Sequence, residues 1–317
     1  DPTEKNVQDG LACFRAEGAE AVVALGGGSP IDCGKAIAIL VTNPMPLSLY
    51  VGRNKIPRAG VPMVAIPTTA GTGSEVTKAS VITDTRNDVK MLLMDPFLVP
   101  AVALVDYELT FSMPQALTAA VGVDTLTHGI EAYVSRLATP VTDPLALACI
   151  GQVALHLEAA WREPANRAAR EGMMIAAMQG GMAFSNSSVC LVHGMSRPLG
   201  ALFHVPHGIS NAMLLPIVTR FSLPGATARY AIVARTMGWA TSSDLDAAAA
   251  HSLVDGLEAL NSRLGIPRLR NDPRMDEAKY NQLIDKMAGD ALASGSPQHN
   301  PVVPDAQQIA GLYRAAW

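Results

Sequence analysis

The sequence predicts an α/β domain followed by an all-helical domain, and three observations support this. Short apolar strands alternate with helical stretches in the first third of the chain. Two of these strands run directly into turns rich in glycine or hydroxyl side chains. After about Asp106 the pattern becomes rich in Ala, Leu and Met with helical periodicity. We therefore place the α/β domain in residues 1–107 and the helical domain in residues 108–317.

Within the first domain the elements follow in order: a helix over 4–17, strands at 21–25 and 62–67, a hairpin-like pair at 80–84 and 89–95, and a strand at 101–106. A further helix begins near Ser29, with Pro30 in its first turn. Continuously apolar strands are typical of a parallel sheet that is covered on both faces. Since the chain opens on a turn and a helix, we expect the front of this domain to precede Asp1.

The second domain reads as helices from residue 113 to the end of the chain, separated by turns that contain proline. We expect no strand in this part. The 317 residues, 49% of them hydrophobic, suffice for a sizeable core.

Composition excludes several classes of function. The net charge of −4 and the aromatic content of 5% do not favour binding to nucleic acid or to an anionic membrane. The four cysteines are scattered without a CxxC pair, so neither a disulfide framework nor a thiolate zinc site is expected. No apolar run approaches the ~20 residues that span a bilayer, and no signal peptide is apparent. These features fit a cytoplasmic protein.

Three consecutive glycines, Gly26, Gly27 and Gly28, separate the first strand from the following helix. A strand that ends in such a turn at a helix N-terminus forms an anion site, because backbone N–H groups and the helix dipole both favour negative charge. The pattern GGGSxxDxxK differs from the common GxGxxG fingerprint. A plain tight turn explains these glycines about as well.

A second polar loop, "TTAGTGSE", follows the strand at 62–67 and offers the hydroxyls of Thr68, Thr69, Thr72 and Ser74. Ligands of open α/β sheets bind beyond the carboxyl ends of the strands, where both loops would lie. Together the loops favour a site for nucleotide phosphates. Alternatively, these residues cap a helix that starts near Gly73.

Candidate metal ligands gather in the helical domain. Asp124 and His128 stand four residues apart, so one helix face presents both. His193, His204 and His207 follow within one short stretch. A carboxylate with two or three imidazoles suits iron or zinc. Single histidines of this kind more often serve as core residues, but four of the chain's seven fall in these two segments.

These segments carry a family resemblance. "GGGSPIDCGK", "IPTTAGTGSEVT", "VGVDTLTHGIEAY" and "HGMSRPLGALFHVPHGISNAMLLP" together resemble the iron-containing (group III) alcohol dehydrogenases over essentially the whole chain. The resemblance implies a partial Rossmann-like cofactor domain, a helical metal- and substrate-binding domain, and hydride transfer in the cleft between them. It implies NAD or NADP as cofactor and Fe²⁺, or alternatively Zn²⁺, as metal.

The resemblance also implies roles for individual residues. The metal ligands would be Asp124, His128, His193 and His207, without His204. The cofactor would meet the two loops and a lysine, at Gly27, Gly28, Ser29, Asp32, Thr68, Thr69, Thr72, Ser74 and Lys90. Phe184 and Val189 can line the substrate pocket, or pack within the helices.

One position departs from the family. Many relatives have histidine where this chain has Arg197, and that histidine is thought to pass protons to solvent. Arginine stays protonated and cannot do so. Either His204 takes over the relay, or Arg197 recognises an anionic group on the substrate, or Arg197 pairs with a carboxylate or with the cofactor phosphates. We therefore place Arg197, His204 and His207 in the catalytic set.

The resulting expectation is an NAD(P)-dependent and metal-dependent oxidoreductase that interconverts a small primary alcohol or diol and its aldehyde. A maleylacetate-type or glycerol-type reductase of the same fold is the alternative. A metal-dependent hydrolase fits less well, since it has no use for two phosphate loops. Relatives are commonly oligomeric, so a homodimer or larger homo-oligomer is expected. The sequence leaves open the choice between NAD and NADP, between iron and zinc, and among alcohols.

Overall fold

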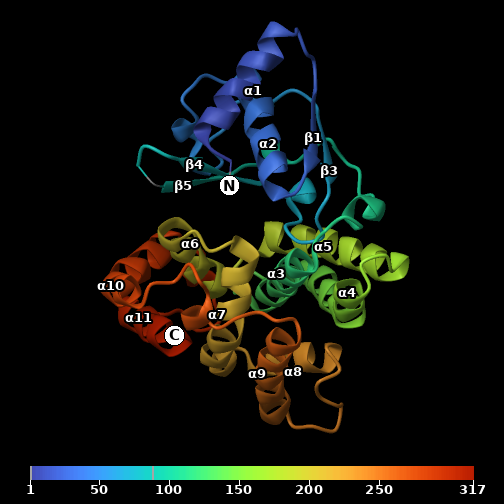
Figure 1. Cartoon of the computed structure of the whole chain (residues 1–317), viewed down its shortest axis with the longest axis vertical. Coiled ribbons are helices and arrows are strands. Elements are labelled where there is room, and N and C mark those ends of the chain that lie inside the picture. The colour runs from blue at the N-terminus through green and yellow to red at the C-terminus, as the bar shows by residue number, and fades with distance from the viewer. Residues whose placement is uncertain (1, 88) are drawn as a thin grey trace.

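The computed structural model describes residues 2–87 and 89–317. It consists of an α/β part followed along the chain by a larger helical part, stacked one above the other in Figure 1. All strands of the described residues lie between Val22 and Ala103, and helices make up the remainder of the regular structure. This is the predicted order of an α/β region and an all-helical region.

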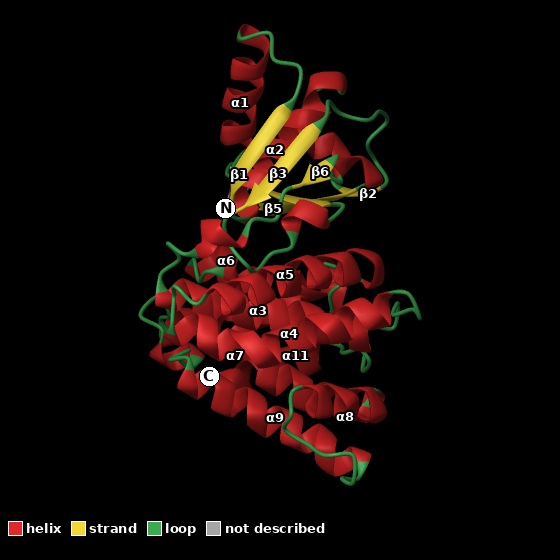
Figure 2. Ribbon diagram, turned by 90° about the vertical axis from the view of Figure 1, so that its right-hand side faces the viewer, coloured by secondary structure: helices red, strands yellow, loops and turns green. Residues whose placement is uncertain are grey.

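A three-stranded parallel sheet forms the centre of the α/β part. Its order is β1 (Val22–Gly26), β3 (Met63–Pro67) and β6 (Val102–Ala103). Helix α1 (Glu4–Ala16) comes before β1, and α2 (Gly28–Thr42) starts directly after it. The carboxyl ends of β1 and β3 point toward the helical part (Figure 2). Both polar loops of the sequence therefore leave the sheet on the side that faces the helices.

The second sheet is mixed, with the order β2 (Gly52–Arg53), β5 (Val89–Met94) and β4 (Ala79–Asp84). Strands β4 and β5 pair antiparallel from Ala79 opposite Met94 to Asp84 opposite Val89. The predicted hairpin-like pair is therefore present. A small core cluster between this sheet, α1 and α2 is built from residues such as Leu40, Ile82 and Leu93.

Three expectations for this part were wrong in detail. The strand predicted at 101–106 has only two residues, because only Val102 and Ala103 pair with β3. The Asp106 side chain then accepts from the Glu108 N–H and caps a 3-10 turn. The alternative helix near Gly73 is a single 3-10 turn, Ser74–Val76, and Gly73 takes a left-handed φ of 59°. The first strand is not covered on both faces. Val23 and Leu25 are 66% and 58% exposed, because α2 packs only on the face that carries Ala24.

The helical part is built around α3 (Gln115–Val134), which is buried along nearly its whole length. The other helices are α4 (Thr142–Arg162), α5 (Arg167–Ser187), α6 (Leu191–Phe203), α7 (His207–Ser222), α8 (Thr227–Thr236), α9 (Asp246–Arg263), α10 (Glu277–Ala293) and α11 (Ala306–Ala316). Helices α4, α5 and α7 contact α3 directly. Polar residues on α3 are consequently held away from bulk water.

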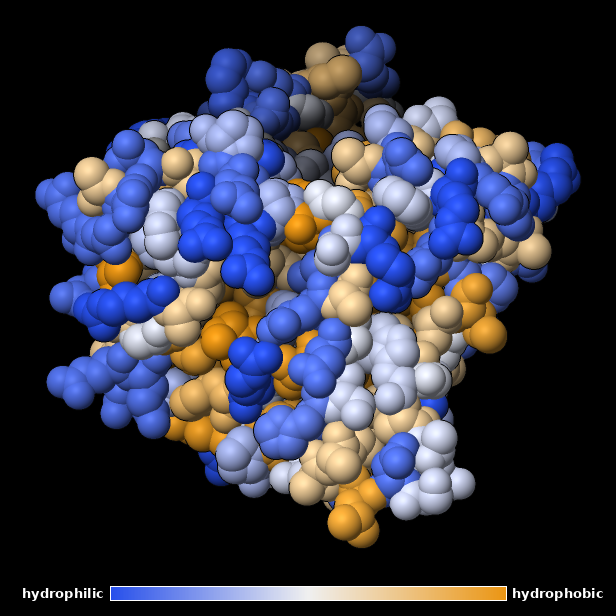
Figure 3. Space-filling view, turned by 60° about the horizontal axis from the view of Figure 1, so that its bottom comes forward, coloured by the Kyte–Doolittle hydropathy of each residue, from blue (hydrophilic) through white to orange (hydrophobic). Residues whose placement is uncertain are grey.

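By length and composition α4 is apolar enough to cross a membrane, and a third of its most apolar window is buried. In the fold it contacts α3 and α5, as a core helix of a helical layer does. Seen from below, the surface carries many polar side chains, with apolar residues between them and at its lower tip and right edge (Figure 3).

The two parts meet where the second polar loop lies on α3 and α5. The Thr125 hydroxyl, on α3, donates to the carbonyl of Ala70 at 3.1 Å. The Lys78 N–H donates to Ser185 Oγ, on α5, at 3.1 Å. Gly73 approaches Gly181 so closely that a Cβ at residue 73 would stand 2.6 Å from the Gly181 Cα. The loop that follows β3 is thus anchored beside Asp124, the neighbour of Thr125.

Candidate metal centre and cofactor loops

Four side chains from three helices converge in the helical part. Asp124 and His128 lie one turn apart on α3, His193 lies in the first turn of α6, and His207 is the first residue of α7. One nitrogen or oxygen from each lies within 4.8 Å of the others. Asp124, His128 and His193 are buried, whereas the His207 side chain is 38% exposed. The cluster therefore opens on the side of His207.

The mutual distances match a four-coordinate metal site. The Asp124 Oδ1 lies 3.7 Å, 3.8 Å and 4.0 Å from the Nε2 atoms of His193, His207 and His128 respectively. The Nε2 atoms of His128 and His193 are 3.0 Å apart. Ligands bound at about 2.0–2.2 Å in a tetrahedron stand roughly 3.3–3.6 Å from one another. The four atoms need only small shifts to reach that geometry.

The protonation of the cluster also suits a cation. Burial lowers the pKa of His193 far below its ordinary value, and the neighbouring His128 and His207 lower it further. Burial likewise lowers the pKa of His207. Burial alone would raise the pKa of Asp124, but the three imidazoles and Asn211 together hold it below the ordinary value. Neutral imidazoles beside a carboxylate are the protonation states that metal ligation requires.

A buried carboxylate that the sequence analysis missed sets the orientation of His193. Glu131 Oε2 lies 2.6 Å from His193 Nδ1, and Oε1 accepts from the Val192 N–H at 2.7 Å. The carboxylate therefore places the proton on Nδ1 and leaves the lone pair of Nε2 directed at the cluster. The sequence carried a signal for this residue, because Glu131 follows His128 by three positions on the same helix.

Asn211 is the second missed residue. Its amide nitrogen lies 2.6 Å from Asp124 Oδ1, 3.1 Å from His207 Nε2 and 3.2 Å from His193 Nε2. A single donor group reaches three of the four candidate ligand atoms, so their lone pairs point to one place. This is the arrangement that a metal cation needs, and the residues fit one. The spacing of four between His207 and Asn211 on α7 was the available signal.

Two further contacts hold the imidazoles. The ring of Phe184, on α5, stacks on His128 with centroids 4.3 Å apart. Ser196 Oγ lies 3.4 Å from His207 Nδ1 and 2.7 Å from Ser210 Oγ. Phe184 was expected to line a substrate pocket or to pack among helices, and its ring covers one face of a candidate ligand.

The two polar loops lie against each other, as the sequence suggested. A Cβ at Gly27 would stand 3.2 Å from Thr69 Oγ1, and one at Gly28 would stand 2.8 Å from Thr72 Cγ2. The Thr68 N–H donates to the Gly26 carbonyl at 2.9 Å. The glycines are therefore needed for close approach of the second loop. They also leave the N-terminus of α2 without a side-chain cap, with its N–H groups available to a phosphate.

Asp32 and Lys35, on α2, fix the position of the second loop by hydrogen bonds to the segment that follows it. Asp32 Oδ1 accepts from the Ser74 hydroxyl at 2.5 Å, and Oδ2 accepts from the Val81 N–H at 2.9 Å. Lys35 Nζ is buried and donates to the carbonyls of Thr77 and Ala79, each at 2.8 Å. Asp32 and Ser74 were expected to contact the cofactor, and their side chains here bind one another.

The remaining predicted residues lie around α6. Arg197 is partly buried, and its Nη1 donates to the Ser294 carbonyl at 3.5 Å. Lys90 Nζ stands 3.0 Å from the place of a Cβ at Gly200. His204 is exposed, ends α6 in a left-handed conformation with φ 55°, and has no side-chain hydrogen bond to the cluster among the described residues.

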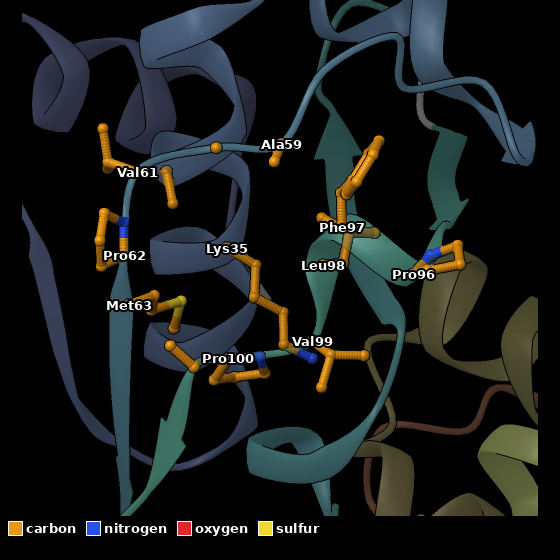
Figure 4. A pocket seen from close by; sticks show the side chains of 13 residues that line it. Lys35, Ala59, Val61, Pro62, Met63, Pro96, Phe97, Leu98, Val99 and Pro100 are labelled. Atoms are coloured by element: carbon orange, nitrogen blue, oxygen red, sulfur yellow. The ribbon is translucent and has the colours of Figure 1, made fainter.

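A cavity of about 270 Å³ lies in the α/β part (Figure 4). Lys35 and residues 59–63 and 96–101 form most of its mainly apolar wall. None of the four clustered residues borders it.

Comparison with known proteins agrees with this arrangement. A family model described as "Iron-containing alcohol dehydrogenase" matches residues 1–107, and one described as "Fe-containing alcohol dehydrogenase family, C-terminal" matches residues 118–317. A 1,3-propanediol dehydrogenase of Klebsiella pneumoniae is 40% identical over 316 residues, which cover 100% of this chain and 81% of the relative.

Two solved structures extend the comparison. A 1,3-propanediol oxidoreductase superposes with a TM-score of 0.96 at 39% identity, covering all of this chain and 82% of the other. A sulfoacetaldehyde reductase from Bifidobacterium kashiwanohense in complex with NAD⁺ superposes with a TM-score of 0.88 at 30% identity, covering 99% of this chain and 81% of the other.

Proposed function

This chain belongs to the iron-containing alcohol dehydrogenase family and is a nicotinamide-dependent oxidoreductase, and we propose that it interconverts a small primary alcohol or diol and the corresponding aldehyde. The family uses NAD(H) and iron. Relatives named for 1,3-propanediol and for methanol support a short alcohol as substrate. A maleylacetate-type or glycerol-type reductase remains the alternative within the fold.

The proposal depends above all on the cluster of Asp124, His128, His193 and His207. We assign these four residues as the metal ligands, and Fe²⁺ or Zn²⁺ as the ion they hold. Bound there, the ion would supply Lewis-acid chemistry, lowering the pKa of the alcohol oxygen. Glu131, Asn211 and Ser196 orient the ligand side chains, and Phe184 shields His128 from water.

The cofactor belongs to the two loops at the carboxyl ends of β1 and β3. We assign pyrophosphate binding to the turn of Gly27, Gly28 and Ser29 at the N-terminus of α2, and further contacts to Thr68, Thr69 and Thr72. Lys90 is assigned to the ribose side. Asp32 and Ser74 act by fixing the second loop against the first. Nicotinamide supplies the hydride acceptor.

The chain's own residues then divide the work. The hydrogen bond from Thr125 to the Ala70 carbonyl keeps the cofactor loop against the helix that carries Asp124 and His128, so cofactor and substrate oxygen meet at a fixed separation. Partly exposed His207 lies at the open side of the cluster and borders the bound alcohol. His204, exposed at the end of α6, is assigned to proton exchange with solvent.

We further propose that residues 1–107 form the cofactor domain and residues 108–317 the metal and substrate domain, that the enzyme is cytoplasmic, and that it works as a homodimer or larger homo-oligomer. The relatives' dehydrogenase names and the similarity to their folds support a non-membrane enzyme.

The direct test is reconstitution. Metal-free protein is loaded with Fe²⁺ or Zn²⁺ and given short alcohols with NAD⁺ or NADP⁺, and reduced nicotinamide is followed by its near-ultraviolet absorbance. We expect reduction of the cofactor that depends on both alcohol and metal. Hydrolysis of an ester without any change in nicotinamide absorbance would instead indicate the metal-hydrolase alternative.

A further inference from the structure

One face of α6 carries three positions of interest at helical spacing. His193, Arg197 and Gly200 stand at i, i+4 and i+7, so they lie in one row along the helix. Successive members of such a row are about 5–6 Å apart. Gly200 leaves space that the Lys90 ammonium occupies, at 3.0 Å from the place of a Cβ there. Two cationic side chains therefore follow the candidate ligand His193 along this face.

The charge of Arg197 is not neutralised by contact. Its one hydrogen bond within the described residues goes to the Ser294 carbonyl, at a long 3.5 Å. No carboxylate of the described residues lies within 4.0 Å of its guanidinium, whereas ten other lysine or arginine side chains of these residues form ion pairs within that distance. A guanidinium has five N–H donors, so most of its donors remain available to a ligand.

Glu131 is the acidic group that acts on the charge of Arg197, and both of its carboxylate oxygens already contact other groups. Glu131 accepts from the Val192 N–H with one oxygen and contacts His193 Nδ1 with the other. Burial lowers the pKa of Arg197, and Glu131 offsets only part of that effect. Arginine nevertheless stays protonated in proteins. A partly buried, permanent positive charge without an ion-pair partner is costly unless an anion arrives to match it.

The place of Arg197 points to the substrate as the source of that anion. Arg197 stands one helical turn after the candidate ligand His193 on α6. At this position its positive charge also contributes to the lowered pKa values of His193 and His207. The phosphate turn at Gly27 and Gly28 instead lies against Thr69 and Thr72, on the loop after β3. An anion between the open side of the cluster and α6 would belong to the molecule whose oxygen is at the metal.

We propose that Arg197 binds a terminal anionic group on the substrate, a carboxylate in the simplest case. This inference rests on the proposed function and narrows it. The preferred alcohols are short hydroxy acids, and the aldehydes are the corresponding semialdehyde acids. Arginine suits this task better than lysine, because its planar fork matches both oxygens of a carboxylate.

The reaction itself is unchanged and balanced. The carbinol C–H bond breaks and its electron pair passes with hydrogen to NAD⁺ as hydride, giving NADH. The hydroxyl proton leaves to solvent, and the alcohol carbon becomes the aldehyde. The carboxylate takes no part in bond making, so its contribution is to hold the chain of the substrate in one orientation.

The test compares 3-hydroxypropionate with 1,3-propanediol, which share a carbon chain and differ at one end. In the wild type we expect kcat/KM to favour the hydroxy acid by about tenfold or more. In Arg197→Gln the ratio of the two kcat/KM values should fall by roughly 10–100-fold. Arg220→Gln removes the same charge from an exposed pair with Glu258 and should leave the ratio within about twofold.

A binding measurement separates this effect from damage to the fold. Calorimetry with zinc-loaded protein and NADH measures the affinity for each alcohol in a mixture that cannot turn over. Arg197→Gln should weaken binding of 3-hydroxypropionate selectively, and Arg197→Lys, which keeps the charge, should restore part of it.

Three results would overturn the inference. The first is a wild type that prefers the diol, and the second is an unchanged ratio of the two kcat/KM values in Arg197→Gln. The third is an Arg197→Gln enzyme whose only defect is a raised KM for NAD⁺, which would place Arg197 at the cofactor. If neither alcohol is oxidised with either cofactor, the proposed function fails, and the calorimetry still decides whether Arg197 binds the carboxylate.

Discussion

Replacing Glu131 by glutamine tests the logic of the metal centre most sharply. Glu131 meets two donors, the Val192 N–H at 2.7 Å and His193 Nδ1 at 2.6 Å, with one oxygen each. Glutamine has a single oxygen and an NH₂ group. If its oxygen accepts from Val192, the NH₂ faces His193 and favours the tautomer that protonates Nε2, the nitrogen directed at the cluster. If the amide is flipped, its NH₂ group faces the Val192 N–H, and neither of these two donors has an acceptor.

The expected loss of metal affinity follows from the number of hydrogen bonds that the substitution removes. One charge-assisted hydrogen bond is lost in a site that is 2% exposed, so water cannot replace it. Such a bond contributes about 1.5–3 kcal/mol. If the loss falls on the state in which His193 can bind metal, the dissociation constant for metal rises by roughly 10–100-fold. That range agrees with the usual effect of removing a carboxylate behind a ligating histidine.

The assay is a competition for Zn²⁺ between the protein and a chromogenic chelator, which yields the dissociation constant without any turnover. Glu258→Gln serves as the matched control, since it makes the same chemical change at an exposed ion pair with Arg220 elsewhere in the helical part. We expect its metal affinity to equal that of the wild type. An affinity in Glu131→Gln within about twofold of the wild type would refute the orienting role of this carboxylate.

Four further outcomes are expected. Asp124→Ala should lose bound metal and dehydrogenase activity together, by metal analysis and rate, and turnover that still depends on metal would contradict its assignment. Gly28→Ala places a methyl group 2.8 Å from Thr72 Cγ2 and should weaken NADH binding about tenfold, measured by fluorescence titration. An unchanged affinity for NADH would argue against this turn as the cofactor site. Lys35→Met removes the donor from the buried Thr77 carbonyl and the partly buried Ala79 carbonyl, and should lower the free energy of unfolding by about 2–4 kcal/mol in urea denaturation. The same change at exposed Lys5 should alter that free energy little. Chelation should lower the melting temperature, since metal at about 100 times its dissociation constant adds roughly 2.7 kcal/mol of stability, and an unaltered melting curve would mean that no ion is held.

The order of α/β and helical parts was predictable because it depends on local signals. Continuous apolar runs gave β1 and β3, and the helical periodicity after residue 113 gave the second part. Extent was less predictable. β6 has two residues because only Val102 and Ala103 pair with β3. Val23 and Leu25 are exposed because α2 packs on the other face of β1. Neither the length of β6 nor the exposure of these two side chains can be predicted from the hydropathy of the sequence.

The sequence by itself determined which residue types can bind a cation and which loops can approach a phosphate, because helical spacing and glycine content are properties of short segments. Only the tertiary structure decided that Asp124, His193 and His207, from three helices, share one centre. It also revealed Glu131 and Asn211, and a guanidinium at residue 197 without a carboxylate partner among the described residues. Such relations depend on how helices pack, since the distance between side chains far apart in the chain is set by the fold and not by their spacing.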